Sequence, residues 1–231
     1  DGDDTLLRGG GGDDTIHGGY GSDQLEGLNG DDVLSGGEGD DKLYAGNGND
    51  TLIGGEGDDI LHGQNGNDFI IGGDADQIFG GSQDDYIELD GSVGGAYADG
   101  GNDFDTVELV GETNTVNLST VERVIGGAGF DTVSLSNTND YTELSGVETV
   151  FAGDGNDILT ITTGDIDAVL GGGGSDSVTL TDGSGNTLLL DGVENITGAE
   201  GFDAITLSDT STSQIGIFGI DAVQGGSGTD R

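Results

Sequence analysis

The chain has 231 residues, of which 51 are glycine, and it contains no cysteine, proline, methionine or tryptophan. It carries 46 acidic residues and four basic ones, so its formal net charge is −42 at pH 7. Phosphate recognition needs lysine and arginine, which excludes nucleic acid as a partner and disfavours an anionic membrane surface. Without cysteine the chain has neither disulfides nor thiolate metal sites. Because there is no run of about 18 apolar residues, we expect no membrane insertion.

This acidic charge needs a counter-charge before the chain can become compact. Bound cations are the natural choice, and carboxylate oxygens suit hard ions such as Ca²⁺. The composition by itself is typical of a disordered acidic linker, but internal repeats argue against that interpretation. Since the chain lacks an initiator methionine and starts inside a repeat, we expect it to be a piece of a longer array.

A nine-residue repeat fills the first part of the chain. Residues 18–26 read GGYGSDQLE, residues 27–35 read GLNGDDVLS and residues 36–44 read GGEGDDKLY. Numbered from 1 to 9, each copy has glycine at position 4, aspartate at position 6 and an apolar residue at position 8. The position-6 aspartates are Asp4, Asp14, Asp23, Asp32, Asp41, Asp50, Asp59 and Asp68, followed after a one-residue deletion by Asp76 and Asp85.

The repeat predicts a coil of short strands and glycine-rich turns. Positions 7–9 are expected to form a three-residue strand with one inward side chain, at position 8, and positions 1–6 to form the turn. Two such strands back to back make a coil of about 18 residues per turn, whose stacking extends the core. The aspartates then form two edge rows: Asp14, Asp32, Asp50, Asp68 and Asp85 on one edge, and Asp4, Asp23, Asp41, Asp59 and Asp76 on the other.

Over residues 1–88 this pattern resembles the G-G-x-G-x-D-x-U-x nonapeptide of the RTX (repeats-in-toxin) family of hemolysin-type calcium-binding proteins. The resemblance implies an all-β fold, a right-handed parallel β-roll or β-helix solenoid with Ca²⁺ ions between stacked glycine-rich turns. It also implies that each ion takes carbonyls from positions 2 and 4 of one turn, carbonyls from positions 1 and 3 of the next turn on that edge, and both aspartates. Roughly eight ions are expected in this part.

The backbone ligands implied by this resemblance complete the candidate metal site. They are Gly18, Gly19, Tyr20, Gly21, Gly27, Leu28, Asn29, Gly30, Gly36, Gly37, Glu38, Gly39, Ala45, Gly46, Asn47, Gly48, Gly54, Gly55, Glu56, Gly57, Gly63, Gln64, Asn65 and Gly66.

A longer period, of about 26 residues, replaces the nonapeptide in the second part of the chain. We expect two domains, a nonapeptide β-roll over 1–90 and a wider β-helix over 91–231 with one aspartate turn per coil. Its inward residues are expected to include Val133, Leu135, Leu144, Val147 and Val150. A single row of aspartates is expected to bind up to about five more ions: Asp105, Asp131, Asp157, Asp176, Asp203 and Asp230. A second acidic ladder is interpreted as a solvated strand face, with a second cation row as the alternative: Glu122, Glu148, Asp167, Glu194 and Asp221.

The resemblance also implies a function. RTX proteins are typically exported unfolded by bacterial type I secretion and fold on extracellular Ca²⁺, so we expect a secreted protein at the bacterial cell surface. The mixture of short and long repeats favours a surface-layer or adhesin scaffold that contacts copies of itself or cell-surface glycans through its parent protein. The alternatives are the C-terminal domain of a secreted exoenzyme or toxin, and a segment of an ice-binding adhesin. We expect no enzyme activity, because the carboxylates recur in register as a ligand ladder does.

Overall fold

A computed structural model describes residues 2, 6–73, 75–90, 95–138, 140–163, 166–183, 185–208 and 215–225. Throughout these residues the regular structure is β-strand, without helix, which agrees with the predicted all-β class. No helix in this part of the chain therefore meets the length and hydropathy needed to cross a membrane. Contacts divide the chain into two compact units, 1–121 and 122–231. Two of the predicted ligands, Asp4 and Asp230, lie outside the described residues, and the predicted boundary after residue 90 stays a prediction.

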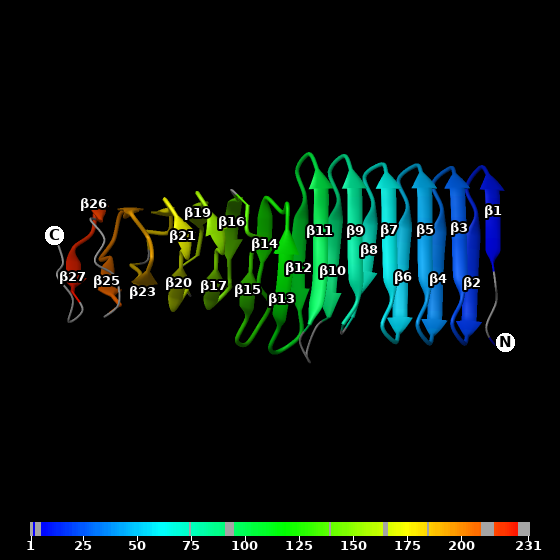
Figure 1. Cartoon of the computed structure of the whole chain (residues 1–231), viewed down its shortest axis with the longest axis horizontal. Coiled ribbons are helices and arrows are strands. Elements are labelled where there is room, and N and C mark those ends of the chain that lie inside the picture. The colour runs from blue at the N-terminus through cyan, green and yellow to red at the C-terminus, as the bar shows by residue number, and fades with distance from the viewer. Residues whose placement is uncertain are drawn as a thin grey trace. The chain divides into compact units, whose positions relative to one another are not determined.

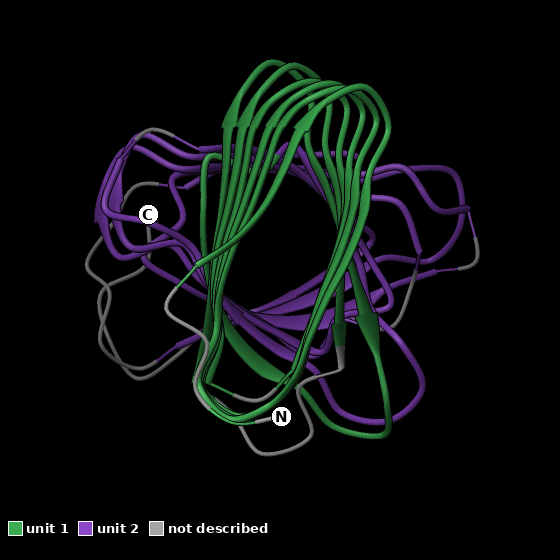
Figure 2. Cartoon of the chain, turned by 90° about the vertical axis from the view of Figure 1, so that its right-hand side faces the viewer, with its two compact units in different colours: residues 1–121 green, residues 122–231 purple. Residues whose placement is uncertain are grey.

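Unit 1 is a coil that alternates between two parallel sheets (Figure 1). One sheet has the order β1-β3-β5-β7-β9-β11-β13 and the other the order β2-β4-β6-β8-β10-β12. The successive turns of this unit superimpose when viewed along its length (Figure 2). The strands are β1 Leu7–Gly11, β2 Thr15–Tyr20, β3 Gln24–Asn29, β4 Val33–Glu38, β5 Lys42–Asn47, β6 Thr51–Glu56, β7 Ile60–Asn65, β8 Phe69–Gly72, β9 Gln77–Ser82, β10 Tyr86–Asp90, β11 Ala96–Asn102, β12 Thr106–Val110 and β13 Thr115–Ser119.

Unit 2 repeats the same alternation with shorter strands. Its sheets have the orders β15-β17-β20-β23-β25-β27 and β14-β16-β19-β22-β24-β26, and β18 pairs with β21 in a small third sheet. The strands are β14 Arg123–Ile125, β15 Thr132–Ser134, β16 Tyr141–Ser145, β17 Thr149–Phe151, β18 Asp154–Gly155, β19 Ile158–Ile161, β20 Ala168–Leu170, β21 Gly173–Gly174, β22 Ser177–Leu180, β23 Thr187–Asp191, β24 Asn195–Thr197, β25 Ala204–Leu207, β26 Gly216–Phe218 and β27 Ala222–Gln224.

The nonapeptide strands are longer than expected. β3 runs over six residues, from position 7 of one repeat to position 3 of the next, so positions 1–3 belong to the strand and the turn is confined to positions 4–6. Both Leu25 at position 8 and Gly27 at position 1 are buried, while Leu28 and Asn29 are exposed. The prediction of a single inward residue per repeat is therefore wrong, because the position-1 residue also faces inward. Its small size leaves room for the aspartate of its own turn.

The core is a column of aliphatic side chains stacked at the predicted inward positions. Position 8 contributes residues that are fully buried: Leu25, Leu34, Leu43, Leu52, Leu61, Ile70, Ile78 and Ile87. In unit 2 the predicted inward residues Val133, Leu135, Leu144, Val147 and Val150 are all buried as well. Burial of apolar area at about 25 cal/mol per Å² therefore stabilises both units between Leu25 and Leu207.

The strand registers contradict the wider coil expected for the second part. Thr149 pairs with Thr132, and Ile158 with Tyr141, so a coil turn in unit 2 has nearly the same length as in unit 1. Backbone-to-carboxylate hydrogen bonds join residues 17 to 19 apart there. The period of about 26 residues thus corresponds to roughly one and a half coil turns. Aspartate turns that are 26 or 27 residues apart consequently lie on opposite edges of the coil, whereas Asp157 and Asp176, 19 residues apart, share one edge.

Candidate metal centre

Each position-6 aspartate of unit 1 is fixed to the turn before it by one oxygen. The N–H of Asp41 donates to Oδ1 of Asp59 at 2.8 Å, and the N–H of Asp23 donates to Oδ1 of Asp41 at 2.7 Å. The same bond, at 2.7–2.8 Å, extends both predicted rows: Asp14, Asp32, Asp50, Asp68 and Asp85 in one, and Asp23, Asp41, Asp59 and Asp76 in the other. Both rows are confirmed, except that Asp4 is not described.

The second oxygen of these carboxylates is buried and lacks a hydrogen-bond donor. Eight aspartates have an Oδ2 atom in this state: Asp32, Asp41, Asp50, Asp59, Asp68, Asp85, Asp157 and Asp176. All eight side chains are almost completely buried. A buried carboxylate oxygen without a partner costs several kcal/mol of desolvation, so the recurrence of the same orphan atom at one position of the repeat points to a bound cation.

Backbone carbonyls line the same space from both sides. The turn of residues 36–41 lies next to the turn of residues 54–59. The carbonyls of Gly37 and Gly39 are directed at this second turn, close to where a Cβ would stand on Gly55 and Gly57. In the second turn, the Glu56 carbonyl accepts the N–H of Gly39 at 2.7 Å.

The Gly54 carbonyl, from the turn of residues 54–59, completes this set. It lies 2.7 Å from the position that a Cβ on Gly36 would occupy, which is also next to Oδ2 of Asp41. Oxygens from positions 2 and 4 of one turn and from positions 1 and 3 of the next therefore lie in the same two adjacent turns as the carboxylates of Asp41 and Asp59.

This donor set fits Ca²⁺ and no softer metal. Calcium takes six to eight oxygen ligands, and carboxylates and carbonyls are the groups that it prefers. Among the described residues no three His, Cys, Asp or Glu side chains gather into a metal-binding group, so backbone carbonyls must supply most of the shell. A bound ion would neutralise the orphan oxygens and hold consecutive turns together.

Glycine at position 1 is required by the site itself. A Cβ on Gly54 would stand 2.5 Å from Oδ2 of Asp59, and a Cβ on Gly18 would stand 2.5 Å from Oδ2 of Asp23. Real Cβ atoms do not approach an oxygen so closely. Position 1 is therefore small because the aspartate of the same repeat occupies that space; the one exception among the candidates is Ala45, whose carbonyl keeps the same direction, 2.6 Å from a Cβ on Gly27.

The single aspartate row expected in the second part is wrong. Asp85 donates its N–H to Asp105, which places Asp105 in the first row of unit 1. In unit 2, Asp157 and Asp176 directly precede β19 and β22 of one sheet, and the N–H of Asp157 donates to Asp176. Asp131 and Asp203 directly precede β15 and β25 of the other sheet, so they lie on the opposite edge. The error has one cause: residues 26 apart lie one and a half coil turns apart, and hence on opposite edges.

Three members of the second acidic ladder are part of these edges and do not lie on a solvated strand face. Glu148 accepts the N–H of Asp131 at 2.6 Å, Glu194 accepts that of Asp176 at 2.7 Å, and Asp221 accepts that of Asp203 at 3.0 Å. Each of these three carboxylates stands where the next aspartate of a nonapeptide row would stand. The sequence carried this signal, because each of the three follows an aspartate by 17 or 18 residues, one coil turn. Asp167 is exposed, as expected for a solvated face.

Two further edge residues lie outside the repeat pattern. Asp140 donates its N–H to Asp157 at 2.9 Å and is buried, with its carboxylate close to the hydroxyls of Ser136 and Thr138. On the other edge, Asn186 donates its side-chain amide to Oδ1 of Asp203 at 2.7 Å. Neither turn contains the full glycine pattern, which is why the motif did not reveal them.

Some carboxylates have their second oxygen satisfied by the protein. Oδ2 of Asp131 accepts the N–H of Gly127 at 2.9 Å, Oδ2 of Asp203 accepts that of Ala199 at 3.0 Å, and Oδ2 of Asp76 accepts that of Gly73 at 2.7 Å. These turns need an ion less than the turns with an orphan oxygen do. In unit 2 the orphan oxygens are those of Asp157 and Asp176, whose turns stack through β18 and β21.

Burial raises the pKa of three of these carboxylates in unit 1. The pKa of Asp68 rises to about 6, that of Asp59 to about 7 and that of Asp85 to about 8, in each case chiefly through desolvation and further through neighbouring carboxylates in the rows. Without a cation, these carboxyl groups retain protons close to neutral pH.

The row geometry predicts that Asp41 matters more for calcium affinity than its neighbour Asp40. Asp40 is exposed and uses Oδ1 to accept the N–H of Asp58 at 3.1 Å. D41N and D40N each remove one charge and keep an acceptor oxygen, so they differ only in position. We expect D41N to raise the calcium midpoint of folding by roughly tenfold, because a lost charged ligand costs about 1.5–3 kcal/mol, and D40N to change it less than about twofold. Equal midpoints in circular dichroism titrations would contradict the assignment.

The raised pKa values predict that protons can partly replace calcium. Relative to the unfolded value of 3.8, protonated Asp59, Asp68 and Asp85 favour the calcium-free fold; this contribution is complete below about pH 4 and is lost as the pH rises through about 6 to 8. We therefore expect the calcium-free chain to gain β-sheet structure as the pH is lowered from 8 to 5. Circular dichroism in calcium-free buffer at four pH values tests this, and a spectrum independent of pH would refute it.

Comparison with known proteins agrees with this geometry. The chain matches the family described as RTX calcium-binding nonapeptide repeat (4 copies) over residues 1–34, 8–43, 17–52, 44–74, 53–87, 72–92, 119–142 and 144–160, which together make up more than half of its length. No curated protein matches the chain. The stacked turns, the paired aspartate edges and these matches establish that the chain belongs to the RTX calcium-binding nonapeptide repeat family.

Proposed function

We propose that this chain is a calcium-dependent structural module of a bacterial protein that is exported unfolded by type I secretion and folds at the cell surface. The observation that carries the proposal is the recurring orphan Oδ2 atom, which leaves the metal-free fold with unpaired buried carboxylates along both edges. In low calcium this penalty, added to a net charge of −42, keeps the chain unfolded and fit for export. Extracellular calcium then drives folding by binding only the folded state.

A scaffold role in a surface layer or adhesin suits this design. The chain extends by adding turns, each of which contacts only its neighbours, so its length follows from its repeat number. Self-assembly or contact with cell-surface glycans would give such a scaffold its partner. We also propose that the chain is not itself an enzyme: its buried carboxylates recur in register, and each uses Oδ1 to hold a backbone N–H.

The direct test of this function is folding against calcium concentration. We expect a disordered circular dichroism spectrum in chelator and a β-sheet spectrum in millimolar Ca²⁺. Mg²⁺ should not replace Ca²⁺, because it demands a tighter octahedron and keeps its waters. A β-sheet spectrum that is fully developed in chelator would remove the basis of the proposal.

The two units should respond to calcium at different concentrations. Unit 1 has orphan carboxylate oxygens in both rows, whereas in unit 2 several turns are satisfied by Gly127, Ala199 and the Asn186 amide. We therefore expect unit 2 to keep its structure at lower Ca²⁺. In hydrogen exchange during a calcium titration, protection should disappear first around Leu34 and Leu43. Earlier loss around Val133 would contradict this, and N186D, which removes the internal donor, should make unit 2 require more calcium.

A further inference from the structure

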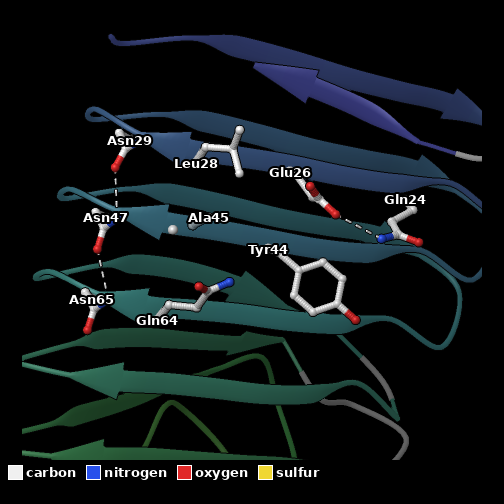
Figure 3. Close-up of a pocket in the computed structure, with 10 residues that line it drawn as sticks. Gln24, Glu26, Leu28, Asn29, Tyr44, Ala45, Asn47, Gln64 and Asn65 are labelled. Carbon is white, nitrogen blue, oxygen red and sulfur yellow. Dashed lines mark hydrogen bonds between the residues drawn. The ribbon is translucent and has the colours of Figure 1, made fainter. Parts of the chain in front are cut away.

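The outer face of unit 1 carries a hollow that the calcium rows do not explain. It has a volume of about 430 Å³ and lies over β3, β5 and β7, on the solvent side of the sheet (Figure 3). That volume is within the range of small-molecule sites. Its lining combines an aromatic ring, an aliphatic side chain and several amides, a mixture that no other part of the repeat needs.

Two residues that line the hollow have a strained backbone conformation. Leu28 and Gln64 occupy position 2 with φ values of 88° and 79°, a backbone conformation that disfavours L side chains. In the register of this sheet they lie on either side of Gly46. Strained non-glycine residues of this kind gather at ligand sites.

The opposite sheet shows what the repeat adopts without such a demand. There, the corresponding row of position-2 residues consists of Gly19, Gly37 and Gly55, all with positive φ. Strands in a sheet are spaced by about 4.8 Å, so Leu28 and Gln64 are roughly 10 Å apart with a bare glycine between them. The gap is the width of one small ring-shaped ligand.

An aromatic row fixes the orientation of the ring at the edge of the hollow. The Tyr44 ring stacks on the His62 imidazole at 5.0 Å and 6°, and His62 stacks on Phe79 at 4.6 Å and 11°. Tyr44 ends the row, next to Glu26 on the neighbouring strand. Figure 3 shows one face of its ring turned toward the viewer, beside Glu26 and Gln24.

Amides and one carboxylate surround this ring with hydrogen-bonding groups. Asn47 donates to Asn29 at 2.9 Å and accepts from Asn65 at 3.0 Å, a ladder that holds each amide in place and leaves further donor and acceptor capacity. On the other side, Gln24 donates to Glu26 at 3.3 Å. Arg8 pairs with Glu26 and offsets its charge.

We propose that this hollow binds one residue of a neutral saccharide. The apolar C–H face of a sugar ring would lie on the Tyr44 ring, between the side chains of Leu28 and Gln64, and its hydroxyls would exchange hydrogen bonds with the surrounding amides. An anionic sugar is disfavoured by the Glu26 carboxylate in the lining and by the excess of acidic residues in the chain. The proposal rests on the proposed function in one respect: the three strands that form the hollow must be folded, which requires calcium.

The test uses the full chain in saturating Ca²⁺ and a panel of neutral oligosaccharides of glucose, galactose, mannose and N-acetylglucosamine, with polygalacturonate as the anionic comparison. We expect calorimetric or array binding to at least one neutral sugar, and none to polygalacturonate. Y44A and Q64G should each weaken it by at least roughly tenfold. Q64G relieves backbone strain, so it should fold as well as the parent chain.

Two control variants match these changes outside the hollow. Y141A removes an exposed tyrosine of unit 2, and Q83G relieves a similar strain at a residue with φ 76°; both should bind the sugar as the parent chain does. The inference fails if a chain that folds with Ca²⁺ binds no neutral saccharide, or binds it equally well with Q64G and Y44A. A chain that does not respond to Ca²⁺ in circular dichroism would instead overturn the proposed function.

Discussion

The fold depends on aspartate side chains whose two carboxylate oxygens have different surroundings. In Asp41 and Asp59, at position 6 of their repeats, Oδ1 accepts the backbone N–H of the preceding turn, and Oδ2 is buried without a hydrogen-bond donor. The first bond and the burial of the side chain hold the carboxylate in the turn, and a cation would satisfy the second oxygen. Glycine at position 1 follows from this arrangement because a Cβ would collide with the same oxygen. The candidate calcium sites are thus formed by the backbone path of the repeat itself.

Unit 2 relieves the same constraint by other means. Where Gly127 and Ala199 donate to Asp131 and Asp203, the turn supplies from its own backbone what a cation would supply. Asn186 goes further, because its amide brings a donor directly to the carboxylate of Asp203. Among the described residues of unit 2, the edge with Asp157 and Asp176 keeps the orphan oxygens of the nonapeptide part. The coil is therefore the same in both units, while the source of its neutralising groups shifts from ions to the chain itself.

Much of the fold and of the candidate calcium sites could be predicted from the nonapeptide repeat. The predictions that were wrong have a common physical origin. The all-β class, both aspartate rows of unit 1 and the inward position 8 follow from a repeat of nine in which each residue's role recurs. The coil size of the second part does not follow from its period, because residues 26 apart fit either one wide turn or one and a half narrow ones. That ambiguity produced the single row and hid Asp140 and Glu148, which only the register of β14 to β17 resolves. The six-residue strands were missed because glycine at positions 1 and 2 indicates a turn from sequence alone.

The repeat also limits where specific recognition can develop. Positions 1, 4, 6 and 8 are committed to ions and core, so a distinctive surface must be built at outward positions such as 2, 3, 7 and 9. Position 2 is the most restrictive of these, because its backbone has positive φ and a Cβ on Gly46 or Gly81 would meet the carbonyl of the previous rung. Side chains at this position therefore cost backbone strain, roughly 1–2 kcal/mol for each residue, and they have glycine neighbours. Leu28, Gly46 and Gln64 follow this alternation, so the steric rule that governs the coil also sets the width of the hollow between them.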